Sequence, residues 1–182
     1  MIIYVHGFGG SGLGKKAQEF RDYFKKYNIP FIAPSLSYVP DLAIKTLEEL
    51  IENFKDVSLV GSSLGGFYTI YLANKYNLKA VLINPSIYPW RTLERSLGYT
   101  PNFYDGSSFE WTESHIEMLK RYDVKNVKSK NFMLLSQKGD DLLDYTQALD
   151  FLPEALHVTE EGGSHSFDGI ERHFGKIEKF LL

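Results

Sequence analysis

Short apolar runs along this chain alternate with longer stretches in which apolar residues recur every three or four positions. The short runs have the length and the β-branched or aromatic content of buried strands, and they cover residues 2–5, 31–33, 57–60, 80–83, 132–136 and 156–159. The longer stretches have helical spacing, and they cover residues 17–27, 41–54, 64–77, 114–122 and 174–181. Asp41 is placed to cap the second of these helices. This alternation predicts an α/β fold with a mostly parallel sheet of about six strands, right-handed crossovers and helices on both faces.

The length and composition of the chain are those of one globular domain. It has 182 residues, of which 43% are hydrophobic and 24% are charged. A chain of this size buries about 70% of the surface that its unfolded form exposes. We therefore expect a single domain over residues 1–182, with its ligand-binding edge at the carboxyl ends of the parallel strands.

The segment from about residue 86 to residue 130 interrupts the alternation of strand and helix. It combines prolines, glycines and serines with many aromatic residues, which are Tyr88, Trp90, Tyr99, Phe103, Tyr104, Phe109 and Trp111. A small cap or lid that covers an active site and supplies an apolar pocket has such a composition. An aromatic cluster that packs as static core under a long loop has it too. The sequence leaves both interpretations open.

The third apolar run ends on a serine that stands between two glycines. Residues 61–65 read Gly-Ser-Ser-Leu-Gly and fit the G-x-S-x-G nucleophile elbow, with a strand before the motif and a helix after it. Glycine on both sides lets the helix begin beside the strand, so that Ser63 projects its hydroxyl from the sheet edge. The Leu64 N–H would then lie at a helix N-terminus, where it can stabilise a developing oxyanion. A serine-rich turn without catalytic function is the weaker interpretation.

The loop after the first strand is rich in glycine, and three motifs compete for it. Residues 7–12 match the dinucleotide pattern G-x-G-x-x-G, but the second strand is not followed by the acidic residue which that pattern requires. Residues 9–15 match G-x-x-x-x-G-K, but Lys16 stands where a phosphate-binding loop needs a hydroxyl for Mg²⁺. The oxyanion loop of a hydrolase explains the glycines together with the serine motif. It makes the Phe8 N–H the expected second oxyanion donor, with Gly9 as the alternative.

Three residues of complementary chemistry each follow a predicted strand. They are Ser63, Asp140 and His165, in the chain order that α/β-hydrolases use for nucleophile, acid and base. A serine hydroxyl needs a base to take its proton, and an imidazole needs an anion that fixes its tautomer and stabilises its charged form. Because the carboxyl ends of parallel strands meet at one edge, we expect these side chains to lie together. Asp141 and Asp144 compete with Asp140 as the acid.

Composition excludes several other kinds of chemistry. The chain has no cysteine, which rules out disulfides, thiolate catalysis and cysteine-ligated metal. Its five histidines lack the spacing of a metal site, and all except His165 are expected to be structural, with His6 holding the loop that follows it. The net charge of −3 gives no reason to expect a nucleic-acid partner. No apolar run reaches the length of a membrane span and no signal peptide is evident, so we expect a cytoplasmic protein without cofactor or metal.

Several motifs together point to a known family. They lie in residues 4–8, 61–68, 83–85, 139–145 and 162–167. On these motifs, almost the whole chain resembles the YqiA-like (UPF0227) family of small bacterial α/β-hydrolase esterases. The Asn-Pro after the fourth strand and the Leu-Asp-Tyr after the acid discriminate more than the elbow, which all such hydrolases share. One departure is the loop 9–12, which is richer in glycine than the family's usual serine-proline segment and leaves the second oxyanion donor open.

The resemblance implies a three-layer α/β-hydrolase fold and hydrolysis of carboxylic esters or acyl thioesters. It also implies that Ser63, Asp140 and His165 form the triad. The expected function is therefore that of a metal-independent serine esterase, which acts on a small-molecule ester through an acyl-enzyme. An acyl thioesterase is one alternative, because a triad fixes acyl transfer and not the leaving group. A catalytically silent hydrolase fold that binds a ligand through its aromatic middle segment is the alternative from another class.

Overall fold

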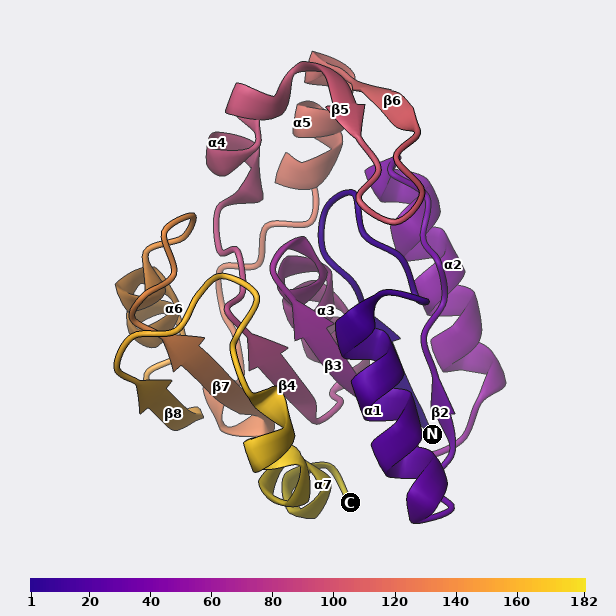
Figure 1. Cartoon of the computed structure of the whole chain (residues 1–182), viewed down its shortest axis with the longest axis vertical. Coiled ribbons are helices and arrows are strands. Elements are labelled where there is room, and N and C mark those ends of the chain that lie inside the picture. The colour runs from indigo at the N-terminus through magenta and orange to yellow at the C-terminus, as the bar shows by residue number, and fades with distance from the viewer.

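The computed structural model describes all 182 residues, and strand and helix alternate in it as the apolar pattern predicts (Figure 1). Six strands form a parallel sheet in the order β2-β1-β3-β4-β7-β8. The strands are β1 (Ile2–Val5), β2 (Phe31–Ile32), β3 (Ser58–Ser62), β4 (Ala80–Ile83), β7 (Phe132–Gln137) and β8 (Leu156–Glu160). The helices around the sheet are α1 (Lys15–Lys26), α2 (Pro40–Asn53), α3 (Leu64–Tyr76), α6 (Tyr145–Phe151) and α7 (Phe174–Leu181). None of the helices combines the length and the apolar character that crossing a membrane requires.

The sheet separates two apolar cores, because successive side chains of a strand point to opposite faces. In β1, Ile2 and Tyr4 face one core while Ile3 and Val5 face the other. Helices α1 and α7 cover the first core, and α2, α3 and α6 cover the second (Figure 1). The predicted three-layer arrangement is therefore confirmed, and it leaves the carboxyl ends of the strands free to build a site.

The segment between β4 and β7 lies beyond the carboxyl ends of the strands, at the top of Figure 1. It contains α4 (Pro89–Thr92), α5 (Glu113–Lys120) and an antiparallel hairpin of β5 (Gly98–Pro101) and β6 (Ser108–Trp111). The pattern of apolar residues does not predict this hairpin. Only Thr100 in β5 and Trp111 in β6 are buried, so the alternation of apolar and polar residues that reveals a strand is almost absent.

The aromatic residues of this segment are divided between core and surface. Trp111 is 1% exposed and packs with Ile116 in the same core as α2 and α3. Tyr99 and Phe103, in contrast, are 82% and 73% exposed. The inner aromatic residues therefore pack as core. The action of the outer part as a lid stays a prediction.

Helix α2 does not begin as predicted. Its N-cap residue is Val39, and Asp41 lies inside the first turn. The Asp41 carboxylate instead accepts hydrogen bonds from Tyr122 Oη at 2.7 Å and from Arg121 Nη2 at 2.6 Å. The cap prediction was wrong because the helix already begins at Pro40, whose fixed φ angle suits the first helical position. The contact of Asp41 with two partners about 80 positions later in the chain ties α2 to the end of α5.

The turn from β3 into α3 is so tight that two of its positions have no room for a side chain. A Cβ atom at Gly61 would lie 2.2 Å from Thr69 Oγ1 and 2.5 Å from the Gly65 carbonyl oxygen. A Cβ atom at Gly65 would lie 2.1 Å from the Val5 carbonyl oxygen. Helix α3 can therefore start directly above β1 and β3 only with glycine at both positions.

A methyl group at Gly65 is expected to weaken the fold. Gly65→Ala should lower the free energy of unfolding by about 2–3 kcal/mol, because the backbone of β1 must move to admit the methyl group. Urea denaturation of the purified variant measures this loss.

Gly175→Ala is the matched control for this experiment. Gly175 lies on the exposed side of α7, and a Cβ atom there would have its nearest neighbour, Tyr23 Oη, at 3.9 Å. Alanine at this position should leave stability unchanged or raise it by up to about 1 kcal/mol. Equal effects of the two substitutions would contradict the close approach as the reason for glycine at residue 65.

Candidate active site

Ser63 follows β3 in a backbone conformation that residues with side chains rarely adopt. Its φ angle is 56° and its ψ angle is −123°. Such a conformation costs of order 1–3 kcal/mol and persists only where the surroundings enforce it. Here the Ser63 N–H donates to the Ile83 carbonyl at 3.1 Å, and the Ser63 carbonyl accepts from Gly66 N at 2.9 Å and from Ser86 N at 3.0 Å. The serine is thereby held above the edge of the sheet.

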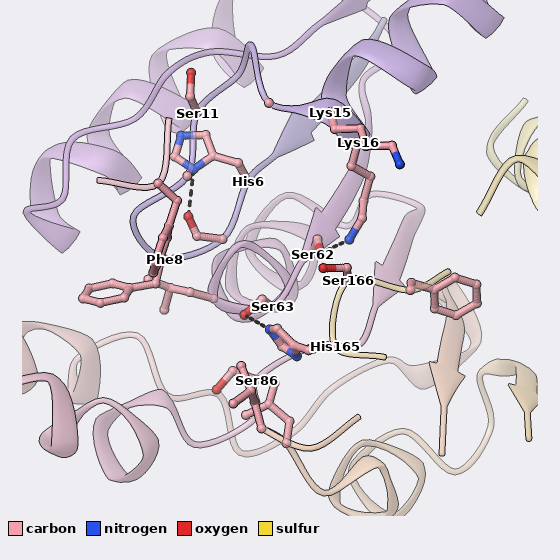
Figure 2. A pocket seen from close by; sticks show the side chains of 18 of the residues that line it. His6, Phe8, Ser11, Lys15, Lys16, Ser62, Ser63, Ser86, His165 and Ser166 are labelled. Carbon is pink, nitrogen blue, oxygen red and sulfur yellow. Dashed lines mark hydrogen bonds between the residues drawn. The ribbon is translucent and has the colours of Figure 1, made fainter. Parts of the chain in front are cut away.

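Ser63, Asp140 and His165 come together in space, although 102 positions separate His165 from Ser63 and 25 separate it from Asp140. His165 Nε2 lies 2.9 Å from Ser63 Oγ (Figure 2). His165 Nδ1 lies 2.8 Å from Asp140 Oδ2. The Asp140 side chain is 2% exposed and that of His165 is 23% exposed. A carboxylate can only accept, so Nδ1 carries the hydrogen and Nε2 faces the serine hydroxyl as an acceptor. The imidazole can therefore take the proton of Ser63.

Of the three acids that follow β7, Asp140 is the one that reaches the imidazole. Its second oxygen, Oδ1, accepts from two backbone N–H groups of the following turn, both at 2.9 Å. Asp144 instead caps α6 and accepts from Thr146 N at 2.9 Å. Asp141 is exposed. The geometry therefore separates the three aspartates that the sequence left in competition.

Two buried amide side chains that the sequence analysis did not assign to the site hold the loop that carries His165. Asn84 Nδ2 donates to the Ser164 carbonyl at 2.9 Å and to the His165 carbonyl at 3.1 Å, and Asn84 Oδ1 accepts from Gln137 N at 3.0 Å. Gln137 Oε1 accepts from Ser164 N at 3.1 Å and from Asp168 N at 2.8 Å. Asn84 belongs to the Asn-Pro motif and could have been found through it. Gln137 carries no such signal in the sequence.

The glycine-rich loop after β1 lies against Ser63. A Cβ atom at Gly7 would lie 3.1 Å from Ser63 Cβ and 3.5 Å from Ser63 Oγ. His6 fixes this loop, because its Nε2 accepts from Leu36 N at 2.9 Å and its Nδ1 donates to the Gly7 carbonyl at 2.9 Å. Burial lowers the pKa of His6, which favours the neutral ring, and the two hydrogen bonds fix its tautomer. The predicted role of His6 is confirmed.

Three backbone N–H groups near Ser63 make no hydrogen bond to another backbone group. Leu64 is the first residue of α3, and the first N–H groups of a helix lack an intrahelical partner. The N–H groups of Phe8 and Gly9 make no hydrogen bond to the backbone. All three are therefore free to donate to a bound molecule.

The β5–β6 hairpin contacts the glycine-rich loop after β1. Phe103 N donates to the Gly9 carbonyl at 2.8 Å. The Phe8 ring meets Phe109 and Trp111 edge to face, with ring centroids 5.5 Å and 4.8 Å apart. These contacts join the β5–β6 hairpin to the loop that faces the serine.

Ser63 and His165 open into a cavity of about 960 Å³, a volume typical of small-molecule sites. The segment between β4 and β7 supplies an apolar wall that includes Leu93, Leu97, Tyr99, Pro101 and Phe103. The first turns of α1 and the loop after β8 supply a polar wall that includes Lys15, Lys16, Glu19, Asp168 and Glu171. No three His, Cys, Asp or Glu side chains in the protein converge as a metal ion would require.

Solved structures of other proteins share this architecture. The α/β hydrolase domain-containing protein 10 from mouse matches with a TM-score of 0.76 at 15% identity, over 99% of this chain and 88% of that one. The Pyrococcus furiosus esterase Pf2001 matches with a TM-score of 0.68 at 16% identity, over 99% of this chain and 80% of that one. At such low identity the likeness shows the fold alone, and the fold is that of the α/β hydrolases.

Related sequences match this chain over its whole length. Residues 1–182 match the uncharacterised protein family UPF0227. A UPF0227 protein of Vibrio atlanticus is 25% identical over 186 residues, which cover 99% of this chain and 98% of that protein. A UPF0227 protein of Pectobacterium carotovorum is 22% identical over 189 residues, with the same coverage. The resemblance inferred from the motifs is confirmed: this chain belongs to the UPF0227 family.

Proposed function

We propose that this protein is a serine esterase that hydrolyses carboxylic esters through an acyl-enzyme. The observation that carries the proposal is the chain of hydrogen bonds from Ser63 Oγ through His165 to Asp140, with lengths of 2.9 Å and 2.8 Å. The esterases and hydrolases among the structures of similar fold support it by analogy. The strained backbone of Ser63 adds support, because strain of this kind clusters at functional sites.

In the proposed reaction, Ser63 Oγ attacks the carbonyl carbon of the ester while its proton moves to His165 Nε2. Asp140 orients the imidazole and stabilises its charged form. When the tetrahedral intermediate collapses, the bond to the alcohol oxygen breaks and His165 returns the proton to that oxygen. Water, activated by the same imidazole, then attacks the acyl-enzyme and releases the acid.

We assign the oxyanion to the backbone N–H groups of Leu64 and Phe8, with Gly9 as the alternative to Phe8. Support comes from their position on the loops that flank Ser63 and from their free N–H groups. A donor of this kind contributes about 10²–10³ to the rate. The bond from Phe103 to the Gly9 carbonyl makes the second donor sensitive to the position of the hairpin.

The rest of the proposal concerns the surroundings of the reaction. Residues 1–182 act as one domain, in which the outer part of the segment 86–130 is the cap and its apolar wall receives the acyl chain or the alcohol.

The absence of cysteine suits a reducing compartment, so we place the protein in the cytoplasm. Acyl thioesters are the competing substrate class, because the triad chemistry is the same for both.

Ser63→Ala tests the proposed nucleophile. The variant should lose at least about 10⁴-fold in kcat for hydrolysis of para-nitrophenyl esters of two to eight carbons, since no other group is placed to form the acyl-enzyme. A parallel series of acyl thioesters identifies the preferred leaving group. Cooperative thermal unfolding of the variant shows that it is folded, and hydrolysis within tenfold of the wild type would contradict the mechanism.

Asp140→Asn tests the proposed acid. The asparagine can keep the acceptor bonds of Oδ1, but its amide group would face His165 Nδ1 as a donor and favour the wrong tautomer. We expect kcat to fall by about 10⁴-fold with little change in stability.

Asp144→Asn is the matched control for the acid. Asparagine caps a helix about as well as aspartate, so this variant should keep both its activity and its stability within experimental error. If Asp144→Asn were as inactive as Asp140→Asn, the assignment of the acid would be wrong.

A further inference from the structure

Lys16 extends from the first turn of α1 into the cavity and reaches the residue before the nucleophile. Its Nζ donates to Ser62 Oγ at 2.8 Å (Figure 2). Lys16 lines the same cavity as Ser63 and His165. Figure 2 shows Lys16 and Phe8 on different sides of Ser63. The proposed hydrolysis makes no use of it.

The charge of Lys16 has no ion-pair partner in the protein. No carboxylate lies within 4.0 Å of its Nζ. Asp140 is already bonded within the triad, and the Glu19 carboxylate pairs with Lys15 at 3.9 Å. Burial raises the pKa of the neighbouring Tyr4 phenol, so Tyr4 stays neutral and cannot balance the charge. A partly buried ammonium without an ion-pair partner is unfavourable, so an anion that enters the cavity would stabilise it.

The stability of α1 does not explain a lysine at this position. Lys15 and Lys16 occupy the first turn of the helix, which contains no acidic residue. The free N–H groups of a first turn carry partial positive charge, so they disfavour lysine and favour anions. The helix N-terminus and the Lys16 ammonium therefore favour a single negative charge at this point of the cavity, although Glu19 and Glu171 lie in the same wall.

We propose that Lys16 binds a carboxylate on the substrate, and that the protein prefers esters whose acid or alcohol part carries such a group near the ester bond. This inference rests on the esterase function proposed above and names its substrate class. An ammonium has three donors, and Lys16 uses one of them on Ser62, which leaves two for a carboxylate. One ammonium balances one negative charge. A dianionic phosphate would leave an excess charge facing the Glu19 and Glu171 carboxylates of the same wall.

Pairs of esters that differ only in a carboxylate test this inference. The acid side is probed by the para-nitrophenyl monoester of glutaric acid against para-nitrophenyl hexanoate. The alcohol side is probed by para-acetoxybenzoate against para-acetoxybenzamide. After subtraction of spontaneous hydrolysis, kcat/KM of the wild type at pH 7 should favour the carboxylate at least about tenfold in one pair, as expected for a charge-assisted contact.

Three variants assign this preference to Lys16. Lys16→Met should bring the ratio of kcat/KM within the pair to about one or below, and Lys16→Arg should retain most of the preference. Lys26→Met removes the same charge from an exposed position at the other end of α1, so its ratio should equal that of the wild type. If Lys26→Met lowers the ratio as much as Lys16→Met, the preference reflects net charge and the inference is wrong.

The pH dependence of the wild type gives a second test that needs no variant. Burial lowers the pKa of Lys16 to about 8, against the opposing effects of Glu19 on the same helix and Asp140 across the cavity. The ammonium is therefore present below pH 8 and lost above it. Both esters of a pair depend on the same proposed triad, so the pH dependence of the shared chemistry cancels in the ratio of their kcat/KM values. The preference for the carboxylate should fall as the pH rises through about 8, while Tyr4 remains protonated.

The possible outcomes separate this inference from the proposed function. Ester hydrolysis that depends on Ser63, with a ratio near one in both pairs or with a ratio unaffected by Lys16→Met, would overturn the role of Lys16 and leave the esterase standing. Ester hydrolysis that is equally absent from the wild type and from Ser63→Ala would overturn both. A ratio that stays constant from pH 6 to pH 10 would also contradict Lys16 as the binding group.

Discussion

The close approach of α3 to β1 and β3 is the constraint on which the rest of the site depends. It requires glycine at residues 61 and 65, since any side chain there would meet backbone or the Thr69 side chain within about 2.2 Å. It forces Ser63 into a positive φ angle and sets the first N–H of α3 directly beside the serine. A helix that started one turn later would place neither the hydroxyl nor the N–H group at the edge of the sheet.

Four other strands of the sheet each lead into a loop or residue of the site. The loop after β1 lies against Ser63, β4 ends at Asn84, β7 leads to Asp140, and β8 leads to His165. Asn84 and Gln137, which are 4% and 2% exposed, join the last three of these by hydrogen bonds. Buried amides of this kind are costly unless every group is paired, so the network holds His165 in one position relative to Ser63.

The sequence predicted those features that depend on local pattern. Most strands were recognisable because they are apolar runs, and the candidate site residues because each lies a few residues after a predicted strand. The β5–β6 hairpin was missed, since its two buried residues leave no alternation to read. The position of Lys16 was also beyond prediction. It depends on a contact with Ser62 across 46 positions, and the sequence shows only a pair of lysines after a glycine-rich loop.

The proposed mechanism requires an activated serine at residue 63. A fluorophosphonate probe measures this reactivity without knowledge of the natural substrate. Intact-protein mass spectrometry of the treated wild type should show one adduct, which peptide mapping should place on Ser63. The same adduct should form at least about 10³-fold more slowly on His165→Ala, because the hydroxyl then lacks its base. A folded wild-type protein that forms no adduct, or one that reacts equally fast without His165, would contradict the account.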